Sequence, residues 1–200
     1  MQSPGDSADR NGTIGVEAFD AAYGAGFQAA DDSPQAVECE LVEDGGAFEA
    51  HRPPEADRPR RVAFVDGTMR TEARLTRTGP EGDLSMGLAG SWAAGAVLVA
   101  GDEPARFDRV ATGRAAIFTG GRPVPLPDHR DGWRWAPFAV DGDDAEAARQ
   151  QLQRLMRDAE ADIAEGLSNE GWLTVLDGPL HGIRHRRGLP VVGYVKTHHR

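Results

Sequence analysis

Two short apolar runs in the sequence each stop on an Asp-Gly pair. The first, Val62–Val65, precedes Asp66, and the second, Leu173–Leu176, precedes Asp177. A run of four or five apolar residues with β-branched members, bounded by a turn signal, is typical of a strand that is buried on both faces. We therefore predict one strand that ends at Asp66 and another that ends at Asp177.

Alternating polar and apolar positions predict further strands around these two. Residues Thr71–Thr78 alternate after the first Asp-Gly pair, and we expect them to turn back and pair antiparallel with the first strand. The other predicted strands are Ala36–Val42, Leu84–Ala100, Phe107–Thr119, Trp133–Val140 and Leu189–Val195.

One long amphipathic helix is predicted after the strand Trp133–Val140 and before the strand that ends at Asp177. Asp143 and Asp144 offer an N-cap, and apolar residues recur with helical spacing from about Ala145 to Leu167. A crossover of this length, right-handed by rule, lays the Asp177 strand parallel to the Asp66 strand. The expected fold class is α/β, a mixed sheet with a long crossover helix.

The N-terminal part of the chain differs from the rest in its composition and residue pattern. Residues 1–13 are polar and predicted to be flexible, and Val16–Gln28 has helix-like apolar spacing. We expect a flexible or helical segment over 1–35 and the main domain over 36–200. No apolar stretch is long enough to span a membrane, the N-terminus lacks a secretory pattern, and the single cysteine, Cys39, fits a reducing compartment, so we expect a cytoplasmic protein.

The charge of the chain is uneven. A net charge of -10 disfavours sequence-independent binding of nucleic acid, which depends on clustered Lys and Arg. The segment from His181 to Arg200 nevertheless contains no acid and includes Lys196, the one lysine of the chain. This basic end is either a phosphate-facing surface or a solvated loop.

The two Asp-Gly acids are the leading candidates for chemistry. Open α/β sheets bind ligands at the carboxyl ends of their strands, so parallel neighbours would bring Asp66 and Asp177 together. Hard divalent cations prefer such carboxylate oxygens. Glu160 is the third candidate because it lies beside the apolar stripe of the helix, whereas Asp158, Asp162 and Glu165 are expected in solvent. The alternative is that both Asp-Gly pairs are ordinary turns.

Other catalytic patterns fit poorly. The strand that ends in Asp66-Gly-Thr is similar to that of haloacid-dehalogenase-like phosphatases, but Phe64 occupies the position of their nucleophilic Asp. Actin-like sugar kinases also use a strand followed by a Gly-Thr turn to bind phosphate, but they need a second nucleotide-binding half, for which this chain is too short. The histidines lack metal-binding spacing, and Trp133 and Trp135 are predicted to be core residues.

Four motifs in order resemble the NurA nuclease family. They are Val62–Thr68, the helical segment Leu155–Glu160, Leu173–Leu180 and Val191–Lys196. The resemblance implies an RNase H-like mixed sheet and a Mn²⁺- or Mg²⁺-dependent DNA nuclease that acts in DNA end processing and repair. It also implies a HerA-type hexameric ATPase partner and a homodimer.

Carried over by position, the resemblance makes Asp66, Glu160 and Asp177 the catalytic metal ligands, and it places Lys196 against substrate phosphate. Family members continue past the last strand, so we expect the domain to be incomplete at its C-terminus. An alternative follows: a catalytically incomplete interaction module that docks an ATPase of this type or nucleic acid.

Overall fold

The computed structural model describes residues 12–18, 54–55, 58–178, 180, 183 and 188–194. Almost all of them belong to one compact unit, formed by Met1–Ala21 and Arg60–Arg200. Of a second unit, Ala22–Pro59, the structure describes four residues. The predicted strand Ala36–Val42 and the predicted domain boundary at residue 35 lie outside the described residues.

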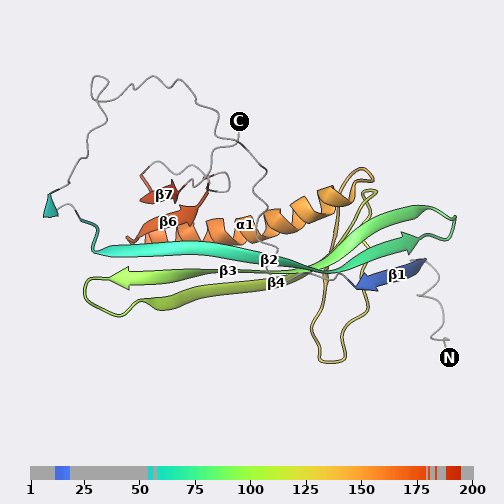
Figure 1. Cartoon of the computed structure of the whole chain (residues 1–200), viewed down its shortest axis with the longest axis horizontal. Coiled ribbons are helices and arrows are strands. Elements are labelled where there is room, and N and C mark those ends of the chain that lie inside the picture. Colours follow the sequence, from blue (N-terminus) through green and yellow to red (C-terminus); the bar gives the residue numbers. More distant parts are fainter. Residues whose placement is uncertain are drawn as a thin grey trace, which may run out of the picture. The chain divides into compact units, whose positions relative to one another are not determined.

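A mixed sheet of seven strands forms the main unit. The strand order is β5-β4-β3-β2-β6-β7, and β1 pairs with β2 off this path. Long strands β2, β3 and β4 run side by side, with helix α1 along them (Figure 1). The elements are β1 Thr13–Ala18, β2 Arg61–Thr78, β3 Leu84–Ala100, β4 Arg106–Phe118, β5 Ala136–Ala139, α1 Ala145–Asn169, β6 Leu173–Asp177 and β7 Val191–Tyr194.

The topology confirms the predicted α/β fold class with its crossover helix. Strands β2, β3 and β4 are successive antiparallel neighbours. Helix α1 then crosses over, so that β6 lies parallel to β2 and β7 lies parallel to β6. In the described part of the chain, no helix has the length and apolar character needed to cross a membrane.

Two local predictions are wrong. The first principal strand does not stop at Asp66, because β2 continues without a turn to Thr78. The register against β3 shifts between Thr71 and Ala73, so the alternation of polar and apolar residues restarts within β2. In the sequence, this restart resembles the beginning of a separate strand. The predicted helix is also wrong at Val16, where β1 pairs antiparallel with β2 and the strand pairing prevails over local spacing.

Helix α1 is fixed at its start and along one side. Asp144 is its N-cap, and Asp144 Oδ1 accepts a 2.9 Å hydrogen bond from the Glu146 amide. Leu152 and Leu167 are completely buried against the sheet. The packing of this apolar stripe, more than helix propensity, holds the helix in place.

The core lies on both faces of the sheet, in different halves. On the face covered by α1, Ala63 and Val65 of β2 pack with Leu167 and Trp172. On the other face, near β1, the loop between β4 and β5 covers a second cluster of buried residues. This cluster consists of Leu75, Ala89, Ala116, Phe118 and Val124, and Leu126 and Trp135 pack against it.

Candidate carboxylate site on the sheet

Asp66 and Asp177 lie on neighbouring parallel strands. Strand β2 pairs with β6 from Val62 and Leu173 to Val65 and Leu176, and the same register continued by one residue sets Asp66 beside Asp177. Neighbouring strands lie about 4.8 Å apart. Both aspartates are exposed. The structure therefore brings these two predicted acids together, although β6 ends at its acid and β2 does not.

The side chains of the two aspartates point away from α1. Successive residues of a strand point to opposite faces. Val65 of β2 and Leu176 of β6 are buried in the core beneath α1, so the residues that follow them, Asp66 and Asp177, face the other side of the sheet. In the half of the sheet that contains these two acids, we call the face that points away from α1 the open face.

Glu160 approaches the same place from the helix. Its side chain is 8% exposed, and α1 places it directly against Gly67. A Cβ atom at Gly67 would lie 2.6 Å from Glu160 Oε1 and 2.8 Å from Met156 Cγ. Gly67 is therefore required for the close approach of the helix to the strand, and not for a turn.

The two aspartates influence the pKa of Glu160. Burial, the negative charge of Asp66 and a smaller contribution from Asp177 together raise the pKa of Glu160 to about 7. Arg157 and the Gly67 amide act in the opposite direction. The same amide donates a 2.9 Å hydrogen bond to Asp66 Oδ1, so Gly67 lies between the two acids.

The donor chemistry suits a hard divalent cation, but the side chains do not surround a single point. Carboxylate oxygens are the ligands that Mg²⁺ and Mn²⁺ accept. Within the ranges that the structure describes, no group of three or more His, Cys, Asp or Glu side chains is arranged to hold a metal ion. Asp66 and Asp177 share one face, while Glu160 lies on the other side of Gly67.

The remaining candidates are the other acids of α1 and Lys196. Asp158 and Asp162 are exposed on α1, in agreement with the expectation that they lie in solvent, whereas Glu165 is half-buried. Lys196 lies outside the described residues, and its assignment stays a prediction. The burial of Glu160 agrees with its position beside the apolar stripe.

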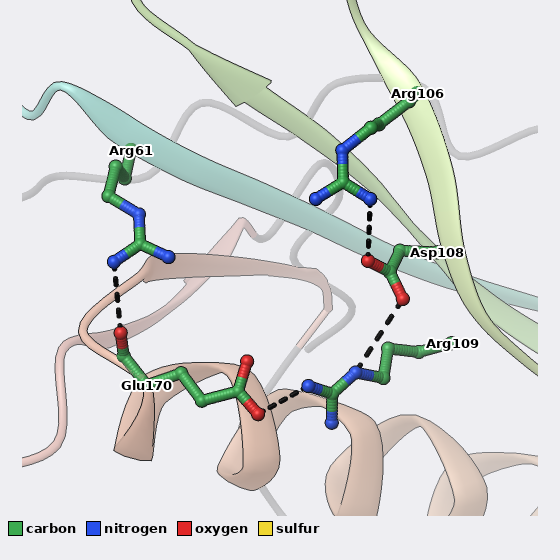
Figure 2. Close-up of polar contacts among 5 residues, drawn as sticks. All are labelled: Arg61, Arg106, Asp108, Arg109 and Glu170. Atoms are coloured by element: carbon green, nitrogen blue, oxygen red, sulfur yellow. Dashed lines mark hydrogen bonds and ion pairs between the residues drawn. The ribbon is translucent and has the colours of Figure 1, made fainter.

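A separate ion-pair network braces the opposite end of the parallel strand pair. Arg61 Nη1 donates to the Glu170 carbonyl oxygen at 3.1 Å, and the Glu170 carboxylate pairs with Arg109. Asp108 then links Arg109 to Arg106, as Figure 2 shows. Because Arg61 begins β2 and Glu170 follows α1, these contacts tie the helix end to the sheet.

Sequence reasoning missed what the open face carries. The sequence indicates for Phe64 only the absence of a nucleophile, yet the residue is 49% exposed on the same face as Asp66. The signal was available in the alternation along β2: if Val65 is buried beneath the helix, Phe64 and Asp66 must point away from it.

The chain matches no protein-family model, and no curated protein matches it.

Proposed function

We propose that the protein is a divalent-metal-dependent nuclease that hydrolyses DNA phosphodiester bonds. The observation that carries this proposal is the parallel register of β2 and β6, which sets Asp66 beside Asp177 on one exposed face. Two carboxylates and a substrate phosphate are a common ligand set for Mg²⁺. The resemblance to NurA nucleases supports the same chemistry.

Each acid has a distinct part in this proposal. Asp66 and Asp177 would hold Mn²⁺ or Mg²⁺ from the open face. A bound ion of this kind activates water and stabilises the leaving oxygen of a phosphodiester. The resemblance makes Glu160 the third ligand, and its carboxylate lies against Gly67 on the face of β2 that α1 covers, opposite to the two aspartates.

The proposed cellular context follows from the resemblance and not from contacts of this chain. It comprises DNA end processing and repair in the cytoplasm, a HerA-type ATPase, a homodimer and a substrate-binding role for Lys196. An RNase H-like core also belongs to it, and the mixed sheet with α1 between β5 and β6 in the chain supports that assignment.

Cleavage of linear DNA in the presence of Mn²⁺ tests the proposal. Wild-type protein should degrade the DNA, and both Asp66→Ala and Asp177→Ala should abolish cleavage. Asp162→Ala is the matched control, because Asp162 is an exposed acid on α1. Equal activity in the wild type and Asp66→Ala would remove the nuclease proposal.

A second function is favoured by the arrangement of the side chains. The described acids do not surround one ion, which suits a non-catalytic module that docks an ATPase or nucleic acid. Calorimetric titration with Mn²⁺ separates the two functions, because only the nuclease needs a cation site that depends on Asp66 and Asp177.

A further inference from the structure

The open face carries two groups of exposed side chains on either side of the acid pair. Along β2, the residues on this face are Phe64, Asp66, Thr68 and Arg70, and all four are exposed. At about 3.3 Å per residue, Phe64 to Arg70 spans about 20 Å. An apolar group, an acidic group and a basic group thus follow one another along one strand.

The basic group is a row of two arginines. Arg70 of β2 is opposite Ser91 of β3, and Ser91 is opposite Arg114 of β4, so both arginines project from one face. The Arg114 guanidinium lies 4.7 Å from the centroid of the Trp133 ring, which holds it in a cation–π contact. Trp133 is in turn stacked on His129 at 4.2 Å.

Glu72 steadies the other arginine without burying it. Its carboxylate accepts a 2.7 Å hydrogen bond from Ser91 Oγ and lies 3.4 Å from Arg70 Nε. The Arg70 side chain remains 51% exposed. Both guanidinium groups are therefore oriented by neighbours and still accessible to an anion in solution.

The apolar group is a cross-strand row on the other side of the acids. Phe64 of β2 is opposite Val97 of β3, which is opposite Phe107 of β4. The row continues in the other direction to Val175 and Val192. Phe107 is 81% exposed, and Phe64 is half exposed. Exposed aromatic surface of this extent is unusual unless it binds something.

Proteins bind single-stranded nucleic acid through arginines and exposed aromatic rings on one surface. Arginine neutralises the backbone, and an aromatic ring stacks on an unpaired base regardless of sequence. A duplex offers the ring no free base face. The order of the groups would place a phosphodiester over Asp66 and Asp177 while its neighbours contact the two flanking groups.

We propose that one unpaired nucleic-acid strand lies along β2 on the open face, with its phosphates bound by Arg70 and Arg114 and a base stacked on Phe64. This inference rests on the proposed nuclease function for the meaning of the acid pair. The binding surface itself does not require catalysis.

Fluorescence anisotropy of a labelled single-stranded oligonucleotide, with EDTA present to prevent cleavage, tests the binding surface. The double variant Arg70→Gln/Arg114→Gln should bind at least tenfold more weakly, and the salt dependence of log K should fall by about 1.4, or about 0.7 for each lost phosphate contact. Arg154→Gln is the matched control, because Arg154 is exposed on α1. Its affinity should equal that of the wild type.

Phe64→Leu tests the stacking contact while keeping an apolar side chain. Its affinity for the single strand should fall about 5- to 150-fold, and its affinity for a blunt duplex should stay unchanged. Circular dichroism checks that each variant is folded. Wild-type affinity in the double arginine variant or in Phe64→Leu overturns the inference, and so does a wild type that prefers the duplex.

The two proposals fail in different ways. If Asp66→Ala cleaves like the wild type but the arginine variant loses binding, the nuclease function fails and the binding surface stands. If Asp66→Ala is inactive but the arginine and Phe64 variants bind normally, the nuclease function stands and the binding surface is rejected.

Discussion

Replacing Glu160 by Gln should change how the stability of the protein depends on pH. Glu160 is buried beside Gly67, and burial together with the charge of Asp66 raises its pKa from an ordinary 4.5 to about 7. As the pH rises above 4.5, the unfolded state loses this proton before the folded state does. The folded state is therefore stabilised by Glu160 below pH 4.5, and that contribution is lost as the pH rises to about 7.

The magnitude follows from the size of the pKa change. At about 1.4 kcal/mol per pKa unit, a rise from 4.5 to about 7 corresponds to at most about 3.5 kcal/mol, and relaxation of the protein and solvent around Glu160 reduces this to about 2–3 kcal/mol. Glutamine resembles the protonated acid in shape. Glu160→Gln should therefore match the wild type at pH 4 and exceed its free energy of unfolding by about 2–3 kcal/mol at pH 8.

Urea unfolding followed by tryptophan fluorescence measures this difference, because Trp172 is buried beside α1. Asp162→Asn, an exposed acid on the same helix, is the control and should change the difference between pH 4 and pH 8 by less than about 0.5 kcal/mol. Parallel pH profiles for the wild type and Glu160→Gln would show that the reasoning about this buried carboxyl is wrong.

Three further substitutions test how the site is held. Gly67→Ala should destabilise the fold by about 1–3 kcal/mol, since the new methyl group meets Glu160 and Met156. Gly95→Ala on the open face is the control and should cost less, because the nearest neighbour of its new methyl group is 3.6 Å away. Urea unfolding compares the two variants, and equal losses of stability would contradict the close approach of α1 to Gly67. Asp144→Ala should lower stability by about 1 kcal/mol through loss of the N-cap hydrogen bond, measured in the same way, and an unchanged value would refute the cap. Leu152→Ala should cost about 2–5 kcal/mol and lower the melting temperature, because Leu152 is fully buried; a cost like that of a surface substitution would contradict the packing of α1.

The sequence was sufficient for the elements whose signals are long and periodic. The stripe from Ala148 to Leu167 and the capping Asp144 predicted α1, and the apolar runs before Asp66 and Asp177 predicted two parallel strands. These predictions succeeded because burial of one face leaves a repeating pattern in the residues themselves.

The arrangement around the acids depends on contacts that no local pattern contains. Asp-Gly signals a turn, and β6 does end at Asp177, yet β2 runs on because it stays paired with β3 as far as Thr78. Gly67 makes room there for Glu160 and Met156. The opposite faces of Asp66 and Glu160 follow from the register with α1, which the sequence does not specify. Local spacing at Val16 also favoured a helix, and pairing with β2 overrode it.

Binding of Mn²⁺ measured by isothermal titration calorimetry tests most directly whether Asp66 and Asp177 share a cation. The full chain should bind the ion at a site that weakens at least tenfold in Asp66→Asn and in Asp177→Asn, while Asp162→Asn binds like the wild type. Equal affinity in the wild type and in both strand variants would contradict the shared site.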